Sequence, residues 1–238
     1  MTSLALIAIA VGVAALIQGA IGVGFALVVA PIAAVMRPDL LPGVILILML
    51  PLNAYVAWRE RNHFDFQSAS WITVGRFAGT FAGLWILLIV TTPVLNLFVG
   101  VTTILAAATT KLAPKFAPNK AVFISAGLIT GVTETATGIG GPPLALVYQH
   151  HAASTLRATI ALCFLIGEVF SVAVLVAEGR LGFAQLRDAL FLAPPLALGL
   201  LGSGCLHERM SAERLRDALL AFAVVSGVVL VVQSTIRN

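Results

Sequence analysis

The stretches QGAIGVGFALVVAP at residues 18–31 and GVTETATGIGGPPLALVY at residues 131–148 decide the fold of this chain. Each places closely spaced glycines inside a long apolar sequence, at Gly22 and Gly24 in the first and at Gly138 and Gly140 in the second. Glycine adopts backbone angles that other residues avoid, and proline lacks an amide N–H and stops a helix. We therefore predict that helices are interrupted at residues 19–24 and 135–143.

The composition around these stretches indicates a membrane protein. Hydrophobic residues make up 60% of the chain and charged residues 10%, whereas soluble domains carry about 25% charged residues. A membrane-spanning helix needs about 20 apolar residues, and the chain offers roughly seven or eight such segments at that length. Apolar pieces at residues 4–17, 25–36 and 142–149 are expected to be too short to span. The predicted fold is an all-α integral membrane protein.

The two glycine stretches belong to a weak internal repeat. Gly22 and Gly24 align with Gly138 and Gly140 at the same spacing, which places Gln18 opposite Glu134. With a small gap, Asn53 falls opposite Glu168. We therefore predict two pseudo-symmetric repeats, residues 1–110 and 120–238, joined by a linker at residues 111–119. Matching interrupted helices in two halves are typical of secondary transporters.

Basic residues distinguish two arrangements of the glycine stretches. If each stretch joins two full crossings, the basic residues of the connecting segments divide eight to five between the two faces. If each is a re-entrant hairpin that enters and leaves on one face, they divide nine to four. Cytoplasmic loops carry the excess of basic residues, so the hairpin is favoured. Each half then has three full spans plus one hairpin, the second half is inverted, and the breaks meet near the midplane.

Non-helical backbone inside a bilayer must be buried in protein or line a water-filled cavity. Helix N-termini attract anions through their free N–H groups and their dipole. The sequence thus predicts an anion site between the two breaks. The alternative is that the glycines only permit close helix packing. The candidate binding residues lie at or beside a break or are polar within a span: Gln18, Gly22, Gly24, Phe25, Asn53, Thr133, Glu134, Thr135, Thr137, Gly138, Gly140, Gly141 and Pro142.

Three ionisable residues lie in apolar segments. An ionised carboxylate is costly there, so Glu134 and Glu168 should be protonated, paired or exposed to water. Our hypothesis is that Glu134 or Glu168 couples transport to protons; the alternative is a hydrogen-bonded structural acid. Arg76 could serve as an anion partner or extend its side chain to the membrane surface, and the second is favoured.

Several classes of function are disfavoured by the sequence. No nucleophile with a matching base, no metal-binding motif and no nucleotide-binding glycine loop is present in the sequence, so we expect no enzyme, cofactor or metal. The basic residues are dispersed over the loops, which indicates that they set the orientation of the chain in the membrane and do not form a nucleic-acid-binding surface. The expected partners are a small anionic substrate and membrane lipid. Whether the chain forms a homodimer stays open.

Residues 18–31 and 131–148, with the duplicated organisation, resemble the sulfite exporter TauE/SafE family of bacterial membrane permeases. The resemblance implies transport of sulfur-containing anions, such as sulfite or sulfonates, across the inner membrane. We expect a secondary transporter that works by alternating access. The alternatives are a channel-like or cation-transporting pore and a non-transporting membrane subunit.

Overall fold

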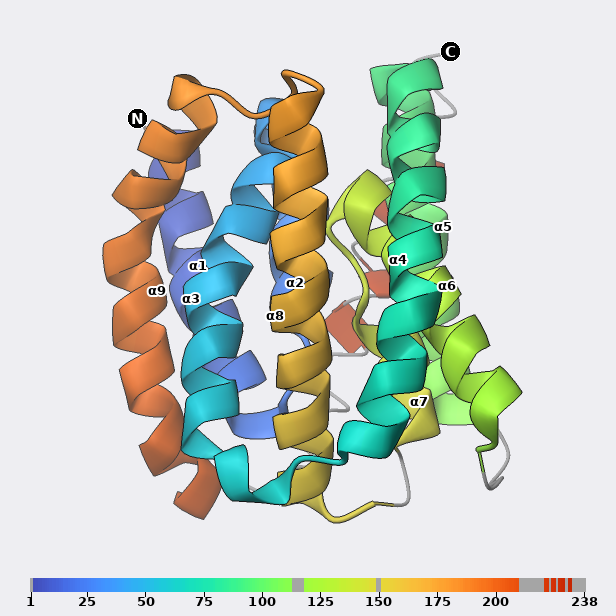
Figure 1. Cartoon of the computed structure of the whole chain (residues 1–238). Helices are drawn as coiled ribbons and strands as arrows, with labels where there is room; N and C mark the ends of the chain where they lie inside the picture. Colours follow the sequence, from blue (N-terminus) through green and yellow to red (C-terminus); the bar gives the residue numbers. More distant parts are fainter. Residues whose placement is uncertain are drawn as a thin grey trace.

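The computed structural model describes residues 2–112, 118–148 and 151–209, and part of residues 221–232. The elements assigned within these residues are helices, and none is a strand (Figure 1). Residues 113–117 of the predicted linker lie outside the described residues.

The helices fall into two consecutive sets. The first set comprises α1 (Thr2–Ile21), α2 (Phe25–Met36), α3 (Gly43–Arg59), α4 (Phe66–Ile89) and α5 (Thr92–Leu112). The second comprises α6 (Lys120–Thr137), α7 (Gly141–Val147), α8 (Ala153–Ala177) and α9 (Phe183–Arg209). Short 3-10 turns follow α2 and α3, at Pro38–Leu40 and Arg61–His63.

Four helices within the described residues are long and apolar enough to cross a membrane: Leu4–Ile21, Phe66–Ile89, Ala153–Ala177 and Phe183–Gly204. The expectation that residues 4–17 form too short a piece is wrong. The helix continues through Gly19, so that α1 has 20 residues. By contrast, α2 has 12 residues and α7 has 7, as expected of short segments.

On α4 large apolar side chains are exposed and polar side chains are buried, which is the reverse of the arrangement on the surface helix of a soluble protein. The large aromatic residues Phe77, Phe81 and Trp85 are exposed, while Arg76 and Thr80 are buried. Aromatic surfaces of this kind suit lipid, and charged side chains in a membrane helix turn to the protein interior. This pattern confirms an all-α integral membrane protein.

Glycines bring α4 and α6 into close contact. Gly75, Gly79 and Gly83 of α4 face Gly127 and Gly131 of α6, and a Cβ added at Gly127 would overlap the carbonyl oxygen of Ile72. Small residues spaced four apart allow this approach of two membrane helices. The equivalent pair, α1 and α9, is similar, since a Cβ at Gly199 would overlap the carbonyl of Gly12.

The packing crosses between the two sets of helices. The first helix of each set packs against the fourth helix of the other, α1 on α9 and α6 on α4, and α3 packs on its counterpart α8. A pseudo-twofold relation between two inverted halves would produce this pattern. The division into two repeats stays a prediction, which the crossed packing supports.

Two ion pairs between the sets distinguish the arrangements of the glycine stretches. Arg37, after α2, lies 2.9 Å from Asp188 near the start of α9, and Arg157 near the start of α8 lies 2.9 Å from Glu60 after α3. In Figure 1 the α8–α9 connection lies at the upper end and the α3–α4 connection at the lower end. The two-crossing arrangement would place the members of each pair on opposite faces. The ion pairs therefore favour the hairpin arrangement.

Candidate functional site

Both predicted helix breaks are present, and both are narrower than predicted. α1 ends before Gly22 and α2 starts after Gly24, whose φ angles are 98° and 128°. α6 ends at Thr137, and the C-cap residue Gly138 adopts the left-handed conformation, with φ 84°. The N–H of Gly138 donates to the Glu134 carbonyl. Residues with a Cβ rarely adopt such angles. The breaks therefore cover residues 22–24 and 138–140, and the wider predicted bounds of 19–24 and 135–143 are corrected.

The two breaks meet in the protein interior. A Cβ added at Gly141 would lie 3.6 Å from the Cβ of Val23, in the first break. Val23 packs against the apolar cluster that holds Leu144 and Phe164. Its counterpart Ile139 is buried in the cluster formed largely by the first set of helices. Each break thus inserts one apolar side chain into the opposite half.

A chain of buried hydrogen bonds begins at the first break. The Phe25 amide donates to Gln18 Oε1 at 2.8 Å, and Gln18 Nε2 donates to Asn53 Oδ1 at 3.0 Å. Asn53 Nδ2 then donates to Glu168 Oε1 at 2.7 Å. The chain links three predicted binding residues to one coupling candidate, and it joins the start of α2 to α8.

A buried ion pair lies beside the second break. Arg76 Nη2 is 2.6 Å from Glu134 Oε2, and the exposed fractions of the two side chains are 1% and 0%. The favoured expectation that Arg76 reaches the membrane surface is wrong. The glycine contact between α4 and α6 turns the Arg76 side of α4 toward Glu134. Figure 1 shows these two helices side by side.

Several polar atoms of this region have no hydrogen-bond partner among the described residues. They include Nε and Nη1 of Arg76, Oγ1 of Thr80, Oε1 of Glu134 and Oε2 of Glu168. Buried polar groups are paired in the great majority of cases. A group of unpaired donors and acceptors around one buried ion pair therefore marks a candidate ligand site.

The three predicted threonines already use their hydroxyl groups. Thr133 donates to the Ile129 carbonyl, and Thr135 shares a hydrogen bond of 2.8 Å with Ser171. Thr137 donates to the Thr133 carbonyl and accepts from the Ile139 amide in the break. An anion could use the Thr133 and Thr137 hydroxyl protons only by displacing these acceptors, whereas either Thr135 or Ser171 can be the donor in their shared bond. The part of the three threonines in binding stays a prediction.

Only some of the backbone amide groups at the two breaks have a hydrogen-bond acceptor among the described residues. Gln18 occupies the Phe25 amide and Thr137 occupies the Ile139 amide. Within the described part of the chain, no hydrogen bond engages the amides of Gly24 and Gly140, which occupy equivalent positions. Gly140 also lies against Glu134, whose carboxylate a Cβ at that position would overlap.

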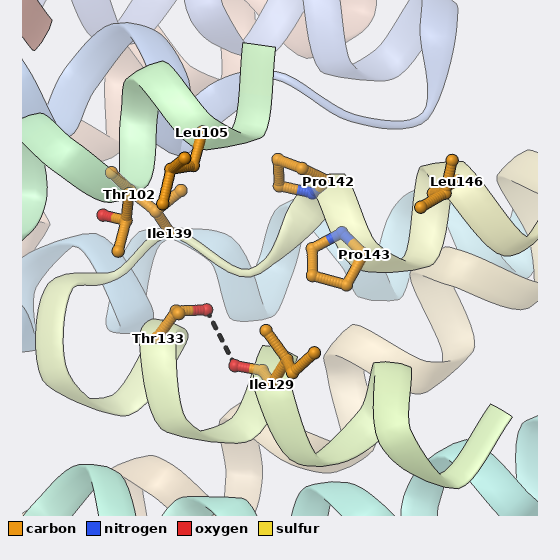
Figure 2. A pocket seen from close by; sticks show the side chains of 8 residues that line it. All are labelled: Thr102, Leu105, Ile129, Thr133, Ile139, Pro142, Pro143 and Leu146. Carbon is orange, nitrogen blue, oxygen red and sulfur yellow. Dashed lines mark hydrogen bonds between the residues drawn. The ribbon is translucent and has the colours of Figure 1, made fainter. Parts of the chain in front are cut away.

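A cavity of about 220 Å³ adjoins the second break between α5, α6 and α7 (Figure 2). Its lining is mainly apolar and comprises Thr102, Leu105, Ile129, Thr133, Ile139, Pro142, Pro143 and Leu146. Figure 2 shows the Thr133 hydroxyl directed at the Ile129 carbonyl. The structure thus separates Thr133 and Pro142 from the polar predicted residues, because they line an apolar cavity.

Paired helix breaks that meet around buried charged groups, inside a bundle with an apolar exterior, define a multi-pass membrane protein of the permease type. The chain belongs to the sulfite exporter TauE/SafE family, whose model matches residues 6–230. This is a family of transporters and not of enzymes. Neither the comparison with curated proteins nor that with solved structures found a match. Among the described residues, no group of His, Cys, Asp and Glu could hold a metal ion.

Proposed function

We propose that this chain is a secondary permease of the inner membrane that carries a small sulfur oxyanion or organosulfonate. The family name, sulfite exporter, supports the substrate class. The observation that carries the proposal is the Arg76–Glu134 ion pair, which is fully buried beside the second break and leaves polar atoms of both residues unpaired.

Transport is proposed to proceed by alternating access between the two halves, residues 1–110 and 120–238. The pairs Arg37–Asp188 and Glu60–Arg157 join the two sets of helices near opposite ends of the bundle. Rocking of the halves would open these contacts in turn. Beside the first pair, the hydrogen bond from Arg37 holds the pKa of neighbouring Asp39 below its usual value, so that the Asp39 carboxylate stays charged at neutral pH.

Coupling to protons is part of the proposal, with Glu134 and Glu168 as the candidate groups. Both carboxyl groups are fully buried, and each has one oxygen without a partner among the described residues. Glu134 faces a cation, whereas Glu168 is bonded to the neutral amide of Asn53. A buried carboxylate that no cation neutralises, such as Glu168, is costly in free energy, so a bound proton balances its charge.

The proposal is tested with the purified chain in proteoliposomes. We expect saturable sulfite uptake that accelerates when an inward proton gradient is imposed, with sulfate, chloride and Na⁺ as comparison ions. Non-saturating flux of chloride or Na⁺ at a similar rate would instead indicate a pore. Absence of flux from the purified chain would indicate a subunit of a larger assembly.

A further inference from the structure

We propose that Arg76 binds the transported anion, and that the anion replaces the carboxylate of Glu134, which takes up a proton in exchange. This assignment rests on the proposed function and names the binding residue of that site. It also selects Glu134, rather than Glu168, as the group that carries the proton.

The guanidinium of Arg76 has donors to spare. An arginine carries five N–H donors in a planar fork that matches oxyanions. In this structure Glu134 engages Nη2 alone, so Nε and Nη1, which together carry three N–H groups, lack a partner among the described residues. A buried cation whose N–H donors lack acceptors is costly in free energy unless a ligand accepts hydrogen bonds from them. A sulfite or sulfonate group presents the three oxygens that such a fork can bind.

The other arginines that have partners in the structure are already engaged near the ends of helices. Arg37 pairs with Asp39 and Asp188, and Arg157 pairs with Glu60. Arg59 donates to the Gly19 carbonyl and to Ser203. Arg61 donates to the Trp58 carbonyl, and Arg187 lies 3.4 Å from Asp188. Arg76 differs from these five because it lies in the middle of α4 with 1% of its side chain exposed.

The surroundings of Arg76 hold its guanidinium in place. A Cβ at Gly167 would overlap the guanidinium, so the space left by this glycine is occupied by Arg76. The Phe164 ring lies under it, with the guanidinium carbon 5.3 Å from the ring centroid. Thr80, one turn further along α4, adds a buried hydroxyl without a partner in the described residues. A guanidinium positioned in this way loses little freedom when an anion binds.

Charge balance determines the exchange. Three titratable groups face Glu134: Arg76 from α4, and Glu168 and Cys163 from α8. The other neighbouring helices add no charge there. α7 has no charged residue, and the charged residue of α5, Lys111, lies in its last turn. The Arg76–Glu134 pair is neutral. A monovalent anion that binds Arg76 would leave a net negative charge in a dry interior unless one proton is bound. As the ion pair opens, a proton from water on the entry side forms an O–H bond on the Glu134 carboxylate.

Gln18 in the first half shows which hydrogen bonds a neutral, protonated Glu134 could make. Gln18 occupies the equivalent position, and a glutamine has the shape and hydrogen-bonding groups of a protonated glutamate. Gln18 accepts the amide of Phe25 at the start of α2 and donates to Asn53. Protonated Glu134 can likewise accept an amide at the start of α7 and donate one hydrogen bond. The neutral side chain therefore has partners after it releases Arg76.

Binding of sulfite to the purified full chain in detergent tests the role of Arg76. We expect Arg76→Gln to weaken binding about 100-fold, because a buried charged partner of the anion is lost. The matched control Arg61→Gln removes an exposed arginine in the turn after α3, whose side chain donates to the Trp58 carbonyl, and it should bind sulfite as the unsubstituted chain does. Because the single variant leaves Glu134 unpaired, the double variant Arg76→Gln with Glu134→Gln is measured too, and it should also fail to bind. Retained affinity in the double variant would overturn the assignment.

The pH profile of binding tests the exchange when it is measured with methanesulfonate, because this anion keeps a single charge over the whole pH range, whereas sulfite itself gains a proton near neutral pH. In the unsubstituted chain, affinity should fall as pH rises, because the ionised Glu134 competes for Arg76. Glu134→Gln should remove this dependence, and Glu168→Gln should keep it. A pH slope retained in Glu134→Gln, or lost in Glu168→Gln alone, would overturn the choice of Glu134. Absence of sulfite binding to the unsubstituted chain at every pH would instead overturn the proposed function itself.

Discussion

Replacing Gly127 by alanine is expected to destabilise the helix bundle by about 2 kcal/mol or more, the range of a severe overpacking change. The added methyl group would overlap the Ile72 carbonyl oxygen, which is backbone and cannot rotate away. α4 and α6 would have to separate, and the Arg76–Glu134 pair between them would lengthen. The measurement is the melting temperature of the detergent-solubilised chain, followed by circular dichroism at 222 nm.

Gly202 on α9 provides the matched control for this substitution. A Cβ there would meet Leu16 Cδ1 at 3.6 Å, an ordinary van der Waals contact. Gly202→Ala should therefore melt close to the unsubstituted chain. Equal melting temperatures for the two alanine variants would show that the glycine contact between α4 and α6 is not as close as the structure indicates.

Replacing Asn53 by alanine should be costly for a different reason. Asn53 both accepts from Gln18 and donates to Glu168, and its exposed fraction is 1%. Its removal leaves two buried polar groups without a partner, at about 1–3 kcal/mol each. We expect a lower melting temperature together with loss of sulfite uptake, because the chain of hydrogen bonds between the first break and α8 is cut.

Asn62, which is exposed in the turn after α3, is the control for the asparagine variant. Asn62→Ala should leave melting and uptake unchanged. If Asn53→Ala also melts and transports like the unsubstituted chain, the buried chain of hydrogen bonds has no part in either property.

The helix breaks could be predicted from the sequence because glycine and proline act locally. Gly22, Gly24 and Gly138 adopt positive φ angles, and such angles depend little on the rest of the fold. The repeat alignment places Asn53 opposite Glu168 but predicts no contact between them. Their hydrogen bond is a finding of the structure.

The extent of the breaks and the place of Arg76 could not be predicted as well. Residues 135–137 continue α6 because Thr135 and Thr137 find hydrogen-bond partners within or beside the helix. The burial of Arg76 depends on which face of α4 meets α6, a tertiary feature. Gly75, Gly79 and Gly83, spaced four apart, were the signal that could have identified this face.

If the two predicted repeats are related by a pseudo-twofold axis, the hydrogen bond between Asn53 and Glu168 lies on that axis. Residues at matched positions touch when they lie on an axis of symmetry. An ancestral half-length protein with asparagine at this position could have made the same contact with an identical copy inserted upside down, because one amide can donate to another. Two glutamates could do so only by sharing a proton. Under the predicted repeat, joining two such copies in one chain allows one side of the axis to carry an acid while the other stays neutral.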